Sequence, residues 1–455
     1  MSSQERISER ASDALSERKA NGLLRQLEAR PETAPWLNLA DNDYLNLSRD
    51  PAVVAAAAEA AQRWGVSAAA SPLITGYTEL HAELERALAG WHGYPHGLVW
   101  NSGFAANSAV LGMLPKRGDV VLADRLIHAS MIAGIMRSGA RLRRFPHNDL
   151  HALQAMLAEE SERRSPDRQV SAAAQADREI GAPTAIFVVT ESIYSMDGDC
   201  PDLAALAQLR EEYEFFWVLD EAHATGWFGE TGAGALESQG CMGAPDVLVG
   251  TLGKAFGSQG AYTLFHDSAF RDWLLNEAGE FVYSTYLAPP AAGAALAALQ
   301  RIKEITAEVN SQGNPPLTPP GRGTDEGDAN AAGSSEQCTS SDAIPSSEGS
   351  GEGSSASPTA FDPLELSRSW RAAMQKVGAK VPDGESPVIP VLLGSAERAI
   401  AVQRELLTRG FRVSCIRPPT VPDGTARLRV SLRRGLSDAQ RDAFAVALKE
   451  ALQCE

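Results

Sequence analysis

The sequence predicts an α/β protein with a mainly parallel sheet, followed by a small α+β C-terminal domain. Three observations support this. Between residues 97 and 265, short apolar runs such as TAIFVVTES and FFWVLDEA alternate with helical stretches. Continuous apolar strands separated by helices are typical of a sheet that is covered on both faces. Strand-like and helical segments alternate again over residues 362–455, after a long stretch that is poor in apolar residues.

The composition excludes several classes of function. The chain has 455 residues and a formal net charge of −17, which argues against binding to nucleic acid or anionic membranes. Its five cysteines are scattered and show no CxxC pair, so we expect a reducing compartment, no disulfide framework and no metal site. The N-terminal residues lack the apolar core of a secretory signal, and no apolar run reaches the length of about 18 residues needed to span a membrane. These features predict a cytoplasmic protein.

The first 50 residues are predicted to form a helix and an arm. The helix covers the first thirty residues, carries Arg25 near its end and is broken by Pro31 and Pro35. Two further helices are expected at 51–64, after a proline in the first turn, and at 78–91.

Residues 51–305 are predicted to form the large domain. Its strands are GLVW, DVVLAD, TAIFVVTES, FFWVLDEA, DVLVGTLGK and GAYTLFH. In such sheets ligands bind beyond the carboxyl ends of the strands, so the polar residues that follow each run are the candidates for function.

Two segments are predicted to lie outside the core. Residues 158–183 lack periodicity and are expected to form a surface excursion. Residues 306–361 form an insert dominated by Ser, Gly, Pro and acidic residues, which is expected to be disordered because it offers too little apolar surface to offset the entropy of ordering. The C-terminal domain, 362–455, contains the strands SPVIPVLLG, FRVSCIR and ARLRVSL and the helices AERAIAVQRELLTRG and SDAQRDAFAVALKEAL.

The letters DEAH at 220–223 raise the possibility of a nucleic-acid helicase. A helicase needs a GxxxxGK[ST] loop that cradles phosphates, and that loop precedes its DEAH motif. The nearest stretch, GTLGKAFG at 250–257, has the wrong glycine spacing, has alanine after the lysine and follows DEAH. The helicase interpretation therefore fails.

Lys254 and Asp220 favour a pyridoxal phosphate site instead. Lys254 follows a strand in a glycine-flanked turn and could hold the cofactor's aldehyde, while Asp220 ends another strand and could keep the pyridine nitrogen protonated. His223 could hydrogen-bond the ring's phenolic oxygen. Taken singly, such a lysine is usually solvated and such an aspartate usually caps a turn; the ordered combination is what favours the cofactor.

Other strand ends supply compatible residues. NSGFAAN at 101–107 precedes a helix whose N-terminus could seat a phosphate, although a simple helix cap is the plainer interpretation. His128 could stack on a planar ring, although alone it is more commonly a core or capping histidine. Glu191 and Ser195 follow TAIFVV at the same edge.

Seven motifs in order resemble the α-oxoamine synthases, which are fold-type-I, pyridoxal 5'-phosphate-dependent acyltransferases. They are SGFAAN, DRLIHAS, TESIYSMDGDCPDL, LDEAHATGWFGETG, TLGKAFGSQGA, VYSTYLAPP and IRPPTVPDGTARLRVSL. The resemblance covers nearly the whole chain apart from the two excursions. It implies a large cofactor-binding domain with a seven-stranded sheet, and a homodimer with shared active sites.

The resemblance also implies roles for individual residues. Lys254 would attach the cofactor covalently, Asp220 would face the pyridine nitrogen, and His223 and Ser195 would lie on the phenolic-oxygen side. His128 would stack on the ring. The phosphate side and the substrate side would be formed by two further sets. On the phosphate side, the resemblance implies Gly103, Phe104 and Thr251, with Ser284 and Thr285 reaching the phosphate in the partner subunit's site. On the substrate side, Asn42 and Arg429 would bind the amino-acid carboxylate. Arg25 and Thr420 would contact the acyl substrate.

The resemblance is strongest to members that join L-alanine to a pimeloyl thioester, carried by CoA or acyl carrier protein, in biotin biosynthesis. Lys254 would remove the α-proton, and carbon dioxide would leave after condensation. Alternatives are a member that uses glycine or serine, or a non-catalytic binding subunit, against which Lys254, Asp220, His223 and Arg429 argue together. Asn46, Ala68–Ala70 and Pro72 depart from the glycine-rich pattern of relatives.

Overall fold

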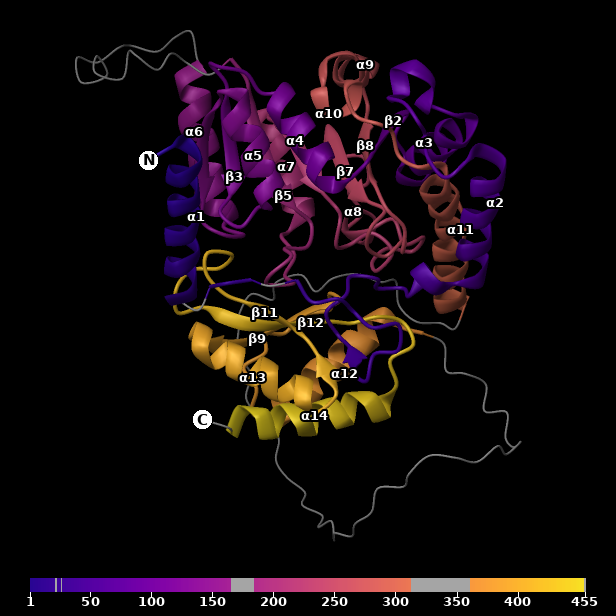
Figure 1. Ribbon diagram of the computed structural model, residues 1–455. Coiled ribbons are helices and arrows are strands. Elements are labelled where there is room, and N and C mark those ends of the chain that lie inside the picture. The colour runs from indigo at the N-terminus through magenta and orange to yellow at the C-terminus, as the bar shows by residue number, and fades with distance from the viewer. Residues whose placement is uncertain (21–22, 26, 165–183, 312–360, 454–455) are drawn as a thin grey trace, which may run out of the picture.

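The computed structural model describes residues 1–20, 23–25, 27–164, 184–311 and 361–453. A large sheet domain with flanking helices lies above a smaller domain formed by the C-terminal part of the chain (Figure 1). This arrangement agrees with the predicted α/β class.

The large domain is built on a seven-stranded sheet with the order β2-β8-β7-β6-β5-β3-β4. Neighbouring strands are parallel except at β8, which is antiparallel to both β2 and β7. The strands are β2 (His96–Trp100), β3 (Val120–Asp124), β4 (Arg141–Phe145), β5 (Ile186–Glu191), β6 (Phe216–Asp220), β7 (Val247–Thr251) and β8 (Ala261–Phe265).

Strand β4 does not appear among the apolar runs of the sequence because it reads RLRRF. It lies at the edge of the sheet, and the guanidinium groups of Arg141 and Arg143 are paired with the buried carboxylate of Glu160 on the neighbouring helix. Charged residues are common on edge strands, which explains why hydrophobic periodicity fails here.

Helices cover the sheet and extend it at one side. They are α2 (Pro51–Trp64), α3 (Glu79–His92), α4 (Gly103–Met113), α5 (Ala129–Ser138), α6 (Leu150–Arg164), α7 (Leu203–Tyr213), α8 (Ala235–Ser238), α9 (Ser268–Glu277), α10 (Gly279–Val282) and α11 (Pro289–Ser311). The single-turn elements are η1 (Leu47–Arg49) and η2 (Pro72–Gly76). Helices α2 and α11 lie side by side, with Gly293 of α11 against the backbone of Ala56.

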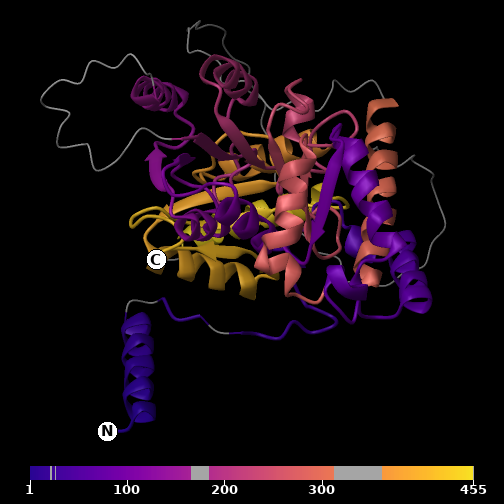
Figure 2. The ribbon, with the colours of Figure 1, turned by 90° about the horizontal axis from the view of Figure 1, so that it is seen from above.

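Three boundaries differ from the sequence predictions. Helix α1 (Ser3–Ala20) ends before Arg25, has no buried residues and stands away from the body (Figure 2). The predicted start of the insert at 306 is wrong, because α11 continues to Ser311 and buries Thr306 and Val309. Likewise 158–164 are the last turns of α6, which bury Glu160. The remainder of both excursions lies outside the described residues.

The small domain contains an antiparallel sheet, β11-β12-β9, packed on helices. Its strands are β9 (Val388–Gly394), β11 (Ser414–Ile416) and β12 (Ala426–Ser431), and its helices are α12 (Pro363–Lys376), α13 (Ala396–Thr408) and α14 (Asp438–Gln453). Helix α12 was not predicted from the sequence. A parallel pair, β1 (Leu37–Asn38) and β10 (Phe411–Arg412), ties the N-terminal arm to this domain. The arm therefore passes close to β12.

No helix within the described ranges is long and apolar enough to cross a membrane.

Candidate active site

The predicted site residues that follow strands β3, β5, β6 and β7 gather at one edge of the large sheet. Strands β3, β5, β6 and β7 are parallel, so the residues that follow their carboxyl ends share that edge. Glu191 and Asp220 are direct register partners on β5 and β6. The edge faces the small domain, because the loop after β5 and the segment after β6 both contact it: Gly198 lies against the carbonyl of Val388, and the Trp227 indole donates to the carbonyl of Glu385 over 2.9 Å.

Lys254 lies in a tight turn three residues beyond β7. The turn closes with a 2.8 Å hydrogen bond from the Gly257 amide to the Lys254 carbonyl. Gly257 has φ +61°, and a Cβ there would lie 2.1 Å from the amide nitrogen of Ser48, so only glycine fits. Burial lowers the pKa of Lys254 from 10.5 to about 8, although the nearby Asp220 and Glu191 act in the opposite direction. The site thus holds a lysine that readily loses its proton.

Asp220 is fixed by an asparagine that the sequence analysis did not single out. The Asn107 amide donates to Asp220 Oδ2 over 2.8 Å and to Ser130 Oγ over 3.2 Å, while the Ala222 amide donates to Asp220 Oδ1 over 2.8 Å. Asn107 Oδ1 is buried and has no hydrogen-bond partner among the residues that the structure describes. Asn107 is the last letter of the NSGFAAN motif, but nothing local indicates that it reaches β6.

His128 caps the start of α5 and is held by its neighbours. Its Nδ1 lies 2.7 Å from Ser130 Oγ, and its backbone amide donates to Glu191 Oε1 over 2.5 Å. Burial and the charge of Lys254 lower the pKa of His128, while Asp220 acts in the opposite direction. Burial and the neighbouring Asp220 raise the pKa of Glu191 well above its usual value. His128 is therefore neutral near pH 7 and remains exposed to solvent.

Tyr44 joins His223 to the predicted carboxylate-binding residues. Its hydroxyl lies 2.6 Å from His223 Nδ1, and Arg429 donates to it over 3.3 Å and to Asn42 Oδ1 over 2.9 Å. Burial raises the pKa of Tyr44 to about 12, and burial together with Lys254 and Arg429 lowers that of His223 well below its usual value. The Tyr44 hydroxyl is also 3.3 Å from Asn42 Oδ1. In the tautomer in which the hydroxyl donates to His223 Nδ1, the proton of the neutral imidazole lies on Nε2.

Arg429 also has a buried Nε that finds no hydrogen-bond partner within the described part of the chain. Because a buried donor is costly to leave unpaired, the guanidinium is suited to accept an additional anionic partner. A carboxylate would satisfy it, and guanidinium–carboxylate pairs are commonly bidentate. Tyr44 was missed by the sequence analysis, although it lies in DNDYLNL beside the predicted Asn42. Asn46 of the same stretch adopts φ +56°, a left-handed conformation that asparagine tolerates in place of glycine.

The start of α4 presents backbone donors beside β7. Ser102 caps the helix by accepting from the Ala105 amide over 3.2 Å, and Gly103 lies next to Thr251, whose hydroxyl would be 3.9 Å from a Cβ at that position. Phe104 is 55% exposed. A helix N-terminus with small residues can bind phosphate. The structure thus brings Gly103, Phe104 and Thr251 together.

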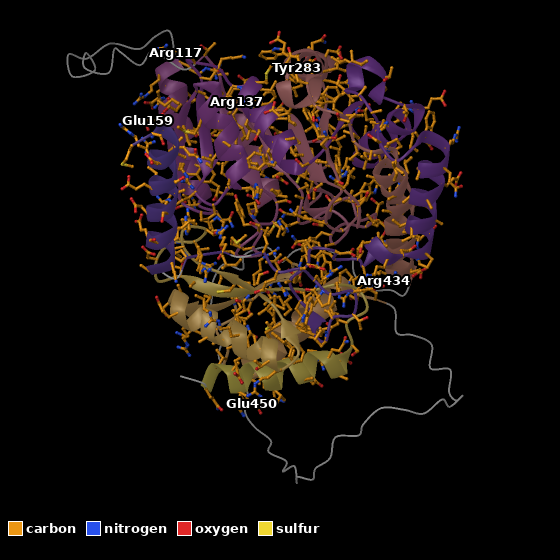
Figure 3. All side chains as sticks on the ribbon, in the orientation of Figure 1. Arg117, Arg137, Glu159, Tyr283, Arg434 and Glu450 are labelled. Atoms are coloured by element: carbon orange, nitrogen blue, oxygen red, sulfur yellow. The ribbon has the colours of Figure 1, made fainter. Side chains whose placement is uncertain are left out.

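Ser284 and Thr285 lie beside Asn101, the residue before the Ser102 cap of this helix. Asn101 donates to Ser284 Oγ over 2.9 Å and to the Thr285 carbonyl over 2.7 Å. The adjacent Tyr283, which directly follows α10, is 87% exposed and lies at the surface of the molecule (Figure 3). The contact of this segment with a partner subunit stays a prediction.

A histidine that the sequence analysis did not identify holds the loop that carries Ser195. His147 Nδ1 lies 3.0 Å from Asp124 Oδ1, and its Nε2 lies 2.8 Å from Asp199 Oδ2. Burial lowers the pKa of His147, but the two carboxylates outweigh it and raise the pKa to about 10. The same loop reaches β12, because Asp197 forms an ion pair with Arg427.

Arg25 and Thr420 meet at the boundary between the arm and the small domain. Arg25 donates to Thr420 Oγ1 over 3.3 Å. Thr420 belongs to the segment that links β11 to β12, and β12 carries Arg429. The two predicted acyl contacts therefore lie together, although α1 ends well before Arg25.

Glu221 of the DEAH stretch has a structural role, because its carboxylate binds backbone amides at the start of α8. It is fully buried and accepts hydrogen bonds from the amides of Ala235 and Leu236 at 3.1 and 2.8 Å, at the start of α8. Burial raises its pKa to about 7. Among the described residues, no group of three or more His, Cys, Asp or Glu side chains could hold a metal ion.

The donor set fits pyridoxal 5'-phosphate. The cofactor requires an amine that loses its proton easily, a fixed carboxylate, a donor for the phenolic oxygen and a phosphate seat. Lys254, the Asn107-bound Asp220, His223 Nε2 and the start of α4 supply these four groups. The orphaned Arg429 Nε adds a partner for a substrate carboxylate.

Comparison with known proteins agrees with this site. The family model for aminotransferases of class I and II matches residues 34–313 and 364–448. Curated relatives include 8-amino-7-oxononanoate synthases from Trichlorobacter lovleyi, 34% identical with 94% of each chain covered, and from Geobacter sulfurreducens, 36% identical with 90% of this chain and 87% of the relative covered. A further one, from Vibrio campbellii, is 32% identical over 97% of this chain and 98% of its own.

Solved structures share the fold. Serine palmitoyltransferase from Sphingomonas wittichii superposes with a TM-score of 0.75 at 23% identity, covering 96% of each chain. The 8-amino-7-oxononanoate synthase from Francisella tularensis gives a TM-score of 0.64 at 24% identity, covering 91% of this chain and 97% of its own. The chain belongs to the class I and II aminotransferase family and, within it, to the family of the 8-amino-7-oxononanoate synthases.

Proposed function

We propose that this protein is an 8-amino-7-oxononanoate synthase, a pyridoxal 5'-phosphate-dependent acyltransferase of biotin biosynthesis. It condenses L-alanine with a pimeloyl thioester and releases carbon dioxide. The observation that carries the proposal is the convergence of Lys254, Asp220, His223 and Arg429 on the edge of the large sheet that faces the small domain. The relatives at 32–36% identity support the choice of substrates.

The cofactor would be held by the residues of this edge. Asp220 would face the pyridine nitrogen, His223 Nε2 would donate to the phenolic oxygen, and Gly103 and Thr251 would receive the phosphate. His128 would lie against the ring. When bound, the cofactor supplies an electron sink for the negative charge that develops at the α-carbon of alanine.

Lys254 and Arg429 perform the remaining tasks. Arg429 binds the alanine carboxylate through its unpaired Nε, and Asn42 and Tyr44 keep the guanidinium in place. Lys254 takes the α-proton at its Nζ. Its pKa of about 8 suits this role, because a group with a pKa near the working pH both accepts and returns a proton.

The assembly is proposed to be a homodimer. Tyr283 presents an 87% exposed aromatic side chain directly before Ser284 and Thr285. Tyrosine is among the residues enriched in protein–protein interfaces relative to the rest of the surface. In this arrangement Ser284 and Thr285 contribute to the phosphate side of the partner subunit's site.

A substrate panel tests the activity. Alanine, glycine and serine are each paired with pimeloyl, acetyl, succinyl and palmitoyl-CoA, and thiol release is measured. We expect alanine with pimeloyl-CoA to give the highest kcat/KM. A preference for glycine or serine would refute the substrate assignment while leaving the cofactor assignment intact.

Two variants test the residue roles. Arg429→Gln should raise the KM for alanine at least ten-fold, the effect of losing one charge-assisted hydrogen-bonding partner of about 1.5–3 kcal/mol. Arg434→Gln serves as the matched control, because Arg434 lies at the surface near the end of the same strand (Figure 3). Lys254→Ala should abolish turnover and the visible absorption of the bound cofactor, and retention of either would contradict the proposal.

A further inference from the structure

Segments that follow the three neighbouring strands β3, β4 and β5 meet at His147, which lies two residues beyond β4. The imidazole lies between two carboxylates: its Nδ1 is 3.0 Å from Asp124 Oδ1, and its Nε2 is 2.8 Å from Asp199 Oδ2. An ionised carboxylate only accepts hydrogen bonds, so both ring nitrogens donate and the ring is an imidazolium. His147 therefore places one positive charge between two negative charges.

The groups around the imidazole agree with this charge. Tyr194 packs edge-on against the ring, with centroids 4.4 Å apart, and Asn148 donates to Asp199 Oδ2 over 2.6 Å. Within the described residues, Asp124 and Asp199 are the charged groups that contact the ring. Burial lowers the pKa of His147, but the two carboxylates raise it to about 10. The ring therefore keeps its charge well above neutral pH.

One carboxylate fixes the loop that leads from β3 to His128. Asp124 is the last residue of β3 and is fully buried. Its Oδ1 accepts a hydrogen bond from the Leu126 amide over 2.7 Å, and its Oδ2 accepts one from the Asn148 amide over 2.8 Å. The loop that carries His128 and the chain after β4 are therefore held by the same side chain.

The other carboxylate holds the turn 194–199 after β5. The Tyr194 amide donates to the Asp199 carbonyl over 3.1 Å, which closes the turn around Ser195. Asp199 Oδ1 has no hydrogen-bond partner in the part of the chain that the structure describes, so the side chain is held through Oδ2 by His147 and Asn148. The position of the turn thus depends on the imidazolium.

The same turn contacts the small domain. Asp197 forms an ion pair with Arg427 of β12, whose side chain is only 7% exposed. Gly198 adopts φ +69°, and a Cβ there would lie 2.2 Å from the Val388 carbonyl, so the turn packs directly on β9. Arg427 and Arg429 are two residues apart on β12, which places them on one face of the strand. A displacement of the turn therefore reaches the guanidinium that binds the substrate carboxylate in the proposed function.

We infer that His147 is a positioning residue for the reaction, which acts through the turn 194–199 on the carboxylate-binding strand β12. This inference rests on the proposed function, in which Arg429 binds the alanine carboxylate. An uncharged side chain at position 147 would leave two carboxylates on either side of it without a cation. Their repulsion and the loss of the hydrogen bond to Asp199 would release the turn, and Arg427 would lose its fixed partner.

Removal of the charge and then of its partner tests the inference. His147→Gln removes the positive charge, and Asp199→Asn in the same background removes the carboxylate that is left without a cation. Leu157→Ala, at a fully buried position on α6, is the matched control for a loss of stability. For each holoenzyme, the KM for alanine and kcat are measured, together with the hydrogen exchange of the peptides that contain residues 194–199 and 426–431.

We expect His147→Gln to raise the KM for alanine about ten-fold and to speed the hydrogen exchange of both peptides, because a carboxylate without its cation is costly to keep in place. The visible absorption of the bound cofactor should persist, since Lys254 and Asp220 lie outside the turn. The added Asp199→Asn substitution should bring the KM for alanine back toward the wild-type value. A role in packing alone would not give this recovery, and Leu157→Ala should change neither the KM nor the exchange of the two peptides.

Asp197→Asn tests the link to the small domain without disturbing the buried imidazolium. The side chain of Asp197 is 28% exposed, so this variant should fold even if His147→Gln proves too unstable to purify. Loss of the ion pair with Arg427 should raise the KM for alanine several-fold and speed the exchange of the peptide with residues 426–431. An unchanged KM in this variant would overturn the inference.

Further results would also overturn it: an unchanged KM for alanine in His147→Gln, no recovery in the double variant, or the same effect in Leu157→Ala. These outcomes are separable from those of the proposed function. If the substrate panel selects another amino acid, hydrogen exchange still reports whether the turn 194–199 and β12 are coupled through His147. If alanine is the substrate and the exchange of β12 does not respond, the positioning role alone is wrong.

Discussion

Replacement of Arg429 by glutamine should raise the pKa of Lys254 in the cofactor-free protein. Burial lowers that pKa from 10.5 to about 8, Asp220 and Glu191 raise it, and the positive charge of Arg429 lowers it. Without the guanidinium, burial alone still lowers the pKa of Lys254, while Asp220 and Glu191 still raise it. The protonated form of Lys254 is then favoured, and less free amine is present at neutral pH.

The size of the wild-type effect follows from the two pKa values. An amine with a pKa of 10.5 is unprotonated in about one molecule in 3,000 at pH 7, whereas one with a pKa of about 8 is unprotonated in about one in ten. Lys254 should thus offer roughly 300 times more free amine than an ordinary lysine at that pH. This fraction limits the rate at which the apoprotein reacts with an aldehyde.

The assay is competitive labelling of the cofactor-free protein with a neutral amine reagent at a series of pH values. Mass spectrometry quantifies the peptide that contains Lys254, and the exposed Lys449 provides an internal comparison. The labelling midpoint at Lys254 should lie near pH 8 in the wild type and higher in Arg429→Gln. A wild-type midpoint above about pH 10, or a downward shift in the variant, would refute the electrostatic account of the site.

Three further predictions concern other parts of the molecule. Tyr44→Phe leaves Nδ1 of His223 without its tyrosine partner. Loss of this hydrogen bond costs about 1–3 kcal/mol, so kcat should fall roughly ten-fold or more while the cofactor stays bound. An unchanged kcat would contradict the proposed hydrogen bond. His147→Gln should lower the free energy of unfolding on the order of 3 kcal/mol below pH 6.5, because the raised pKa of His147 means that the folded protein holds a proton that the unfolded chain loses more easily. The difference between the variant and the wild type should vanish as the pH rises toward 10. Thermal unfolding at a series of pH values measures it. Ala69 has φ +60°, so Ala69→Gly should relieve about 1–2 kcal/mol of backbone strain in the folded state. This gain exceeds the cost of about 0.5–1 kcal/mol from the greater entropy of glycine in the unfolded chain, so the melting temperature should rise. Ala68→Gly, at an ordinary φ, should lower the melting temperature.

Residues at strand ends were predictable because chain order and the parallel sheet fix where they meet. Lys254 follows one apolar run and Asp220 ends another, so their convergence requires only that the two strands be parallel. The same rule placed His128 and Glu191. The class of fold and the family followed from these motifs, and the comparisons confirm both.

The residues that sequence reasoning missed act across the fold. Asn107 reaches Asp220 from a helix 113 residues away in sequence, and Tyr44 reaches His223 across 179 residues. No periodicity or spacing reports such contacts, because they depend on how the arm and α4 pack on the sheet. His147 follows the basic strand β4, which hydrophobic patterning does not detect. The end of α11 was missed because its last turns contain several polar residues.

Strand β12 shows where the chain cannot accept a change in length. Arg427 and Arg429 alternate with the fully buried Leu428 and Val430, so one face of the strand carries both arginines and the other fills the core. Both arginines are buried on the polar face of the strand. A slip of one residue against β9 would turn them into the apolar core and present two aliphatic side chains to the substrate. A single-residue insertion between β11 and β12 that shifts this pairing would therefore remove two interactions together: the binding of the substrate carboxylate by Arg429 and the ion pair between Arg427 and Asp197. Both would be lost even if the rest of the enzyme folded normally.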